Sequence, residues 1–189
     1  MLFRSARILC ASLAVASAGR ELPAQEKSAP AKLTEHFEID EIRVLFNKEG
    51  ADAVTTEDAN KNDVPDQVED VAKQVWAAHR LFCGTLDFPD PLKSERYKGV
   101  KFIEVKIRQQ DLIKGGNGLA FDEPQRSALP TDPNGTKAIT LTVGNHVVPA
   151  KNITPAHETF HLIQYGATDR KSTRLNSSHV SESRMPSSA

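Results

Sequence analysis

The apolar residues of the chain fall into segments with two different periods. Residues 37–40 and 42–46 carry β-branched and aromatic residues with partial alternation, which predicts a first β-strand. Further along, apolar residues recur at steps of three and four, so that they share one face of a helix that ends near Gly84. The positions on that face are Val68, Val71, Ala72, Val75, Ala78 and Phe82. We expect this helix to pack against a sheet.

The second half of the chain predicts two more strands around a long loop. Ile103, Val105 and Ile107 alternate with Glu104 and Lys106, as expected for a strand with one buried face and one wet face. Residues 138–143 are predicted to form the other of these two strands. The span 115–135 between them is rich in glycine and proline, and loops of that length are more often functional than not. The span 115–135 is therefore a candidate for one wall of a cleft.

A last helix begins at Thr154. We expect Thr154 to cap it, Pro155 to occupy the first helical position and Gly166 to lie near its end. No internal repeat is visible. The order of strands and helices therefore predicts an α+β fold.

Composition and charge narrow the class of protein. With 39% apolar and 26% charged residues among 189, the chain suits one globular domain. The formal net charge of -1 provides no basic stripe and no acidic tail. Neither a nucleic-acid partner nor a membrane-surface partner is predicted.

The first 24 residues resemble an export signal. Arg4 and Arg7 precede an apolar run over residues 8–18, and small residues at 16–18 or after Ala24 suit a cleavage site. The run is too short to anchor the mature protein in a bilayer. We expect a secreted or periplasmic protein with a linker at 25–35. Lipid anchoring at Cys10 is an alternative that the residues before it do not favour.

The cysteines and three of the histidines carry no chemical motif. Removal of the signal leaves Cys83 alone, so no internal disulfide can form, and we expect a buried, inert thiol. His36, His79 and His146 are interpreted as structural or surface residues.

Both ends of the chain resemble translated sequencing adapter. Residues 169–179 are similar, residue for residue, to the translation of a short-read adapter, 180–189 to its remainder, and 1–5 to the partner adapter. Residues 169–189 also have no apolar period. We therefore expect 169–189 to be an artefactual disordered tail and the native insert to span about 6–168, with the folded domain at 36–168.

The last helix carries a motif for metal chemistry. His157 and His161 are four residues apart, which corresponds to about 6 Å of rise, so that both imidazoles project from one face and can share a zinc ion. Glu158 can act as base toward a zinc-bound water. The predicted chemistry is hydrolysis. The alternative is two ordinary surface histidines on a helix.

The third zinc ligand is not evident. The metzincin pattern needs glycine at 164 and histidine at 167, where this chain has Gln164 and Ala167. A gluzincin-type site takes its third ligand, a glutamate, from a later helix. His179 is not a candidate ligand, because it lies in the presumed adapter. Cys83 as an upstream ligand has no supporting motif. We therefore expect an incomplete and inactive fragment that lacks its third zinc ligand.

A second ion site is predicted before the first helix. Its spacing is that of an EF-hand-type loop, in which alternate oxygens converge on Ca²⁺. The candidate ligands are Asp58, Asn60, Asn62, Val64 (through its carbonyl), Asp66 and Glu69. Asp63 stands where the turn favours glycine, and Pro65 interrupts the usual path into the helix. The alternative is a polar turn that caps the helix.

Three segments together resemble a family of secreted bacterial zinc metallopeptidases. They are DANKNDVPD at 58–66, LDFP at 86–89 and TPAHETFHLIQYG at 154–166, and only the last is sharply specific. The resemblance covers about 42–166. It implies a zincin-like mixed sheet with a backing helix and an active-site helix, truncated before its carboxyl-terminal subdomain. It also implies His157 and His161 as zinc ligands and Glu158 as base.

Two functions follow from these expectations. The first is a zinc metallopeptidase that cleaves protein or peptide substrates outside the cytoplasm. The second is a non-catalytic, calcium-stabilised extracellular binding module that retains the histidines without their chemistry. Substrate specificity and oligomeric state are not predicted.

Overall fold

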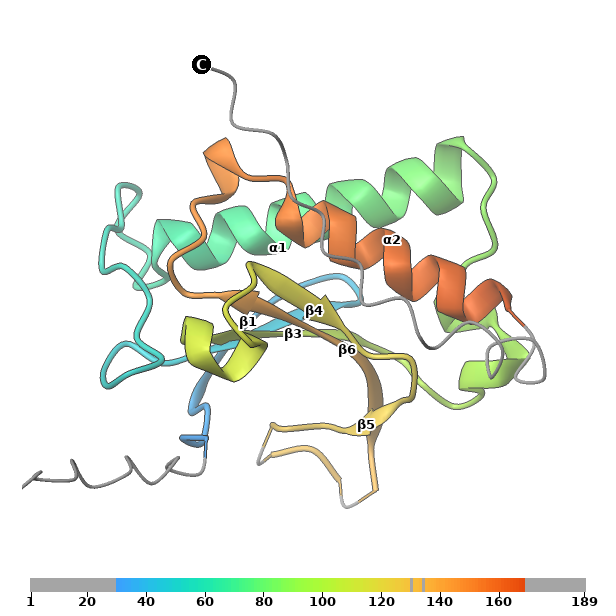
Figure 1. Cartoon of the computed structure of the whole chain (residues 1–189), viewed down its shortest axis with the longest axis horizontal. Helices are drawn as coiled ribbons and strands as arrows, with labels where there is room; N and C mark the ends of the chain where they lie inside the picture. The colour runs from blue at the N-terminus through green and yellow to red at the C-terminus, as the bar shows by residue number, and fades with distance from the viewer. Residues whose placement is uncertain (1–29, 130, 134, 169–189) are drawn as a thin grey trace, which may run out of the picture.

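The computed structural model describes residues 30–129, 131–133 and 135–168 (Figure 1). The predicted signal peptide, the first five residues of the predicted linker and the predicted tail at 169–189 lie outside these residues, as do Cys10 and His179. Leu33, which falls in the predicted linker, belongs to the packed structure, because its side chain is buried against Leu45 and Leu129.

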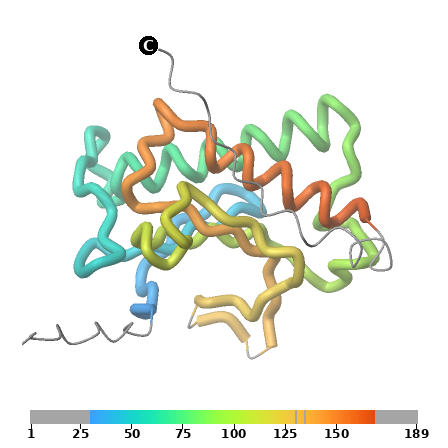
Figure 2. Tube along the Cα trace, viewed as in Figure 1, coloured from blue at the N-terminus to red at the C-terminus, as the bar shows by residue number. Residues whose placement is uncertain are grey.

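The described chain forms one mixed sheet with both α-helices on the same face, which confirms the α+β prediction (Figures 1 and 2). The strand order is β1-β2-β3-β6-β4, and β5 pairs with β6. The central strands β2, β3 and β6 are parallel, whereas β1 and β4 are antiparallel to their neighbours. The strands are β1 (Glu35–Ile39), β2 (Ile42–Phe46), β3 (Ile103–Arg108), β4 (Gly118–Ala120), β5 (Gln125–Arg126) and β6 (Lys137–Gly144), and the α-helices are α1 (Asp66–His79) and α2 (Thr154–Ala167).

The predicted first strand is in fact a hairpin of two strands. Asp40 adopts the left-handed conformation (φ 50°), which turns the chain so that Ile39 pairs with Ile42. Aspartate tolerates this conformation better than most residues, so a tight turn forms without glycine. The alternation on either side of the turn resembles a single interrupted strand, which explains the difference.

The predicted amphipathic helix is confirmed as α1. Val68, Val71, Ala72 and Val75 are fully buried on the face that meets the sheet and α2. After His79 the helix continues as a π-helical segment, η1 (Arg80–Thr85), in which Leu86 N–H donates to the carbonyl of Leu81 at 2.9 Å. The helical path therefore ends close to the predicted Gly84.

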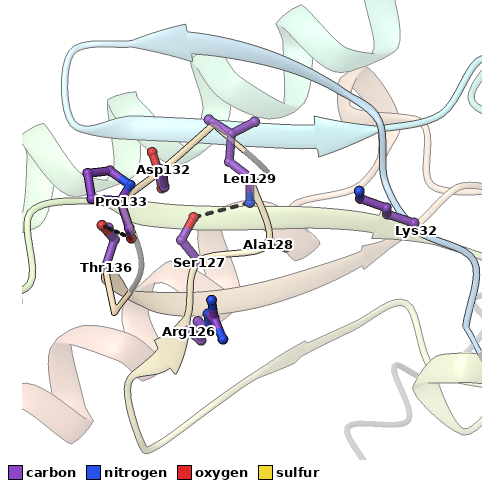
Figure 3. Close-up of a pocket in the computed structure, with 8 residues that line it drawn as sticks. All are labelled: Lys32, Arg126, Ser127, Ala128, Leu129, Asp132, Pro133 and Thr136. Atoms are coloured by element: carbon purple, nitrogen blue, oxygen red, sulfur yellow. Dashed lines mark hydrogen bonds between the residues drawn. The ribbon is translucent and has the colours of Figure 1, made fainter.

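The prediction that β3 has one wet face is wrong. Glu104 is 0% exposed, because the loop that carries β5 crosses this face of the sheet (Figure 1). Ser127 Oγ donates to Glu104 Oε2 at 2.9 Å, and Ala128 N–H donates to the same carboxylate. This loop also forms a small depression, away from α2 (Figure 3). Its lining residues are Lys32, Arg126, Ser127, Ala128, Leu129, Asp132, Pro133 and Thr136.

The predicted cap of the last helix is corrected. Thr154 is the first residue of α2, and the side chain of Asn152 holds the helix start instead. Asn152 Oδ1 accepts hydrogen bonds from Thr154 N at 2.9 Å and Thr154 Oγ1 at 2.6 Å. Pro155 still falls in the first turn, where its missing N–H costs nothing. Gly166 lies near the end of the helix, as expected. No helix in the described part of the chain is long and apolar enough to cross a bilayer.

Candidate metal centre

The structure brings the two histidines of the motif together on α2. His157 Nε2 and His161 Nε2 are 3.0 Å apart, and the rings meet edge to face at 88°. His157 is exposed and His161 is half-buried, so the two nitrogens converge at the protein surface. A pair of imidazole nitrogens aimed at one point is a ligand arrangement that zinc accepts.

Gln164 orients the second histidine. Its Oε1 lies 3.0 Å from His161 Nδ1, and the ring of Tyr165 stacks on the imidazole at a centroid distance of 6.1 Å. Because an amide oxygen can only accept, Nδ1 carries the proton and the lone pair of Nε2 faces His157. At the sequence level Gln164 only argued against a metzincin site. Gln164 follows His161 by three residues, so the two side chains lie about one helical turn apart on the same face, and this spacing could have predicted their contact.

Glu158 lies against strand β4 of the sheet. It is 8% exposed, and a backbone hydrogen bond from Ala120 of β4 reaches its carboxylate. Burial raises the pKa of Glu158, while the nearby His161 and His157 and the Ala120 hydrogen bond act in the opposite direction. A carboxylate with a raised pKa binds a proton more readily, as a general base must.

Gly118 lets β4 approach α2 closely. A Cβ atom at this position would lie 2.5 Å from Thr154 Cγ2 and 2.8 Å from Glu158 Cγ, which is closer than van der Waals contact permits. Only glycine fits between the strand and the helix here. The glycine-rich loop that the sequence marked as a cleft wall therefore includes the strand that supports Glu158.

No third ligand stands beside His157 and His161 within residues 30–129, 131–133 and 135–168. In this part of the chain, the one group of three metal-ligating side chains with ligand atoms within 4.8 Å of one another is His79, Cys83 and Asp90. These residues could hold a metal ion.

This group differs from what the sequence indicated for its members. His79 is 4% exposed and lies 3.2 Å from Asp90 Oδ1 through its Nε2, and Cys83 is half-buried rather than fully enclosed. The four-residue spacing of His79 and Cys83 equals that of the zinc motif and was a signal that sequence reasoning passed over. Asp90 could not be found this way, because only the fold returns it to His79.

The predicted calcium loop is compact. Asp58 accepts from the backbone N–H groups of Asn62 and Asp63 at 3.2 and 2.9 Å, and the amides of Asn60 and Asn62 donate to Glu69 at 3.1 and 2.7 Å. Asp63 takes the left-handed conformation (φ 67°) in the position that favours glycine.

Two further candidate calcium ligands make hydrogen bonds within this loop. Asp66 accepts from Ala59 N at 3.1 Å, and Val64 N–H donates to Asn62 Oδ1 at 2.9 Å. Hydrogen bonds from Lys73, then Asn62 and Asn60, lower the pKa of Glu69 and keep it ionised. Asp58, Asn60, Asn62 and Glu69 thus form one connected polar group.

No family model, curated protein or solved structure matches the chain. The chemistry of the site therefore carries the functional conclusion.

Proposed function

We propose that the protein is a zinc-dependent peptidase that acts outside the cytoplasm, with a zincin-like domain. The observation that supports this most is the convergence of His157 and His161 beside a buried, strand-supported Glu158. Two surface histidines without a function would not need a carboxylate buried next to them, because burial of a carboxylate costs stability.

The donor set fits zinc. The 3.0 Å separation of the Nε2 atoms fits one shared proton, with one ring as donor and the other as acceptor. A zinc ion held by both lone pairs would replace this proton. When bound, zinc supplies Lewis-acid polarisation of a carbonyl and lowers the pKa of a water molecule. The third protein ligand would come from residues outside those described.

Glu158 would take a proton from the attacking water. The hydrogen bond from Ala120 fixes its carboxylate, and the partly enclosed position weakens its ionised form. Both features suit a base that must hold a proton and release it to the leaving amine.

The edge strand β4 would bind the substrate backbone. It is the last strand in the sheet order, runs antiparallel to β6 and contacts α2. An extended peptide can add to such an edge by main-chain hydrogen bonds. Leu119, which is 40% exposed, would offer an apolar contact there.

Replacement of the base tests the proposed function. In the product of the natural gene that contains residues 30–168, we expect Glu158→Gln to lower zinc-dependent cleavage of an unfolded protein about 10²–10⁴-fold, because proton transfer is lost. Zinc affinity should be unchanged. His161→Ala, as the matched variant, should lower zinc affinity as well. Full cleavage by the Glu158→Gln protein would contradict Glu158 as the base. Absence of zinc-dependent cleavage by the wild-type protein would contradict the peptidase and favour the calcium-stabilised binding module.

We propose in addition that the loop over 58–69 binds Ca²⁺ as a structural clip. Calcium should raise the melting temperature of the wild type, because an ion bound only by the folded state stabilises it. Glu69→Gln should abolish this rise, since the bidentate position loses its charge. A wild-type melting temperature that does not change with calcium would contradict the calcium site and favour the alternative, a polar turn that caps the helix.

A further inference from the structure

A second candidate metal site lies at the carboxyl end of α1, apart from the histidine pair on α2. A ring nitrogen of His79, Cys83 Sγ and a carboxylate oxygen of Asp90 all lie within 4.8 Å of one another. The separation of His79 Nε2 and Asp90 Oδ1 is 3.2 Å. With bonds of about 2.0 Å to N and O and about 2.3 Å to S, the donors of a tetrahedral zinc site are about 3.3–3.8 Å apart. Small side-chain movements therefore complete the geometry.

The backbone is shaped to bring these three residues together. The π-helical segment η1 widens the turn after His79, and such segments are frequent at functional sites. Asp87 then takes the left-handed conformation (φ 57°), and Phe88 N–H donates to the Phe82 carbonyl at 2.9 Å. This closed turn directs the chain back, so that Asp90 faces His79.

Glu41 occupies the position of an outer-shell partner. Its Oε1 lies 2.7 Å from His79 Nδ1, at an angle outside hydrogen-bond geometry, and Asp90 faces the other ring nitrogen, Nε2. Histidines that bind zinc generally present their second nitrogen to a carboxylate, which fixes the tautomer and directs the lone pair of Nε2 at the metal.

We propose that His79, Cys83 and Asp90 bind one Zn²⁺, with Glu41 as the positioning residue of His79. One nitrogen, one thiolate and one carboxylate form a donor set that zinc accepts, and thiolate disfavours the hard ions Mg²⁺ and Ca²⁺. A water molecule fills the fourth position. This site is independent of the proposed peptidase function.

The competing arrangement is a metal-free triad. His79 would then lie between Glu41 and Asp90 without a metal, and Cys83 would take no part. Burial, followed by the charge of Asp90, raises the pKa of the Cys83 thiol to about 11 in the absence of metal. Zinc binding converts the thiol to a zinc thiolate and releases its proton to solvent. Participation of the sulfur therefore distinguishes the two arrangements.

The proposed ion joins three parts of the fold. Glu41 belongs to the turn between β1 and β2, His79 ends α1, and Asp90 precedes the short 3₁₀ helix η2 (Pro91–Lys93). Pro91 packs against Gly166 near the end of α2, and Ser94 Oγ donates to the Gly166 carbonyl at 2.6 Å. The ion would thus have a structural role and connect the sheet edge to both helices.

Cobalt titration tests this site and separates it from the histidine pair. The protein is the full 189-residue chain, reduced, with Cys10→Ser and with His157→Ala and His161→Ala to remove the other site. We expect one equivalent of Co²⁺ to produce a near-ultraviolet thiolate-to-cobalt charge-transfer band. Cys83→Ser should abolish this band, and Glu41→Gln should weaken cobalt binding about 10–100-fold.

Two results would overturn the proposal. One is the absence of the band in the folded chain that retains Cys83, with folding checked by circular dichroism. The other is a band that persists after Cys83→Ser. Because the test chain lacks His157 and His161, neither result bears on the peptidase, and failure of the peptidase test does not bear on this site.

Discussion

Asp40 has two roles in the turn between β1 and β2. Its backbone adopts the left-handed conformation, and its Oδ2 accepts hydrogen bonds from Trp76 Nε1 at 2.8 Å and Arg80 Nη2 at 3.0 Å. These two hydrogen bonds, that of Trp76 first, lower the pKa of Asp40. The turn is thereby tied to the outer face of α1.

The charge of Asp40 predicts a pH-dependent stability difference. Because the folded-state pKa is lowered, the ionised carboxylate stabilises the fold above its unfolded pKa of about 3.9, and this contribution is lost as the pH falls through the folded pKa. Asp40→Asn retains a residue that tolerates the left-handed turn and removes only the charge. Urea unfolding should show the wild type to be more stable at pH 7 and equal to the variant in strong acid. An equal difference at both pH values would contradict this origin.

The histidine pair could be predicted from the sequence because its geometry is local. His157 and His161 are one helical turn apart, so any helix brings them together. Asp90 could not be predicted as a partner of His79, because its position depends on the π-helical segment and on the left-handed Asp87. The burial of Glu158 was equally hidden, since β4 comes from a distant part of the chain.

At the scale of elements, the contact between β4 and α2 decides where the base lies. Gly118 leaves no space for a side chain between the strand and Glu158. A change in this contact would therefore affect the position of Glu158, and with it the proposed activity, more than the position of the two histidines.

Gly118→Ala should lower cleavage without removing the metal. The added methyl must displace Glu158 or separate the strand from the helix, and a shift of about 1 Å in a catalytic group costs about 10²-fold in rate. We expect a fall in kcat of that order with zinc affinity retained, measured by steady-state kinetics and zinc titration. Gly84→Ala is the matched control, because nothing lies within 4 Å of its added methyl. Wild-type kcat in Gly118→Ala would show that the contact does not position the base.

Elements with a local period were predicted well, and those set by tertiary contacts were not. The 3.6-residue period of α1 and the alternation of β3 are properties of the segments themselves. The covering of Glu104 depends on a loop more than twenty residues later, through Ser127 and Ala128. Period alone cannot show that a polar face is covered, so the strand was predicted correctly and its environment was not.

Across the whole molecule, polar side chains of α1 hold the segment that leads into α2. Gln74 Nε2 donates to the carbonyls of Pro149 and Asn152 at 3.1 and 3.2 Å, and its Oε1 accepts from Ala156 N at 3.3 Å. Gln67 does the same for the preceding turn, since its Nε2 donates to the Val147 carbonyl at 2.8 Å. The first helix therefore sets the position of the second.

Gln74→Ala should loosen the start of α2. Its loss leaves two carbonyls and one N–H without their partner, which costs about 1–3 kcal/mol of unfolding free energy. We expect faster amide hydrogen exchange at Ala156 and a lower denaturation midpoint, with Asp70→Ala on the exposed side of the same helix as control. Unchanged exchange at Ala156 would show that packing alone holds the helix.

The contact between Ala120 and Glu158 also has a consequence for the order in which the protein matures. Because the chain is synthesised from its amino end, β4 is made before α2. β4 must also pair with β6 before Ala120 can donate its hydrogen bond to Glu158. His157 and His161 become neighbours as soon as α2 forms. Glu158 reaches its position only after strands distant in the sequence have paired, and this pairing is the slow part of folding. Under the proposed function, the two metal ligands would therefore come together before the base is in place.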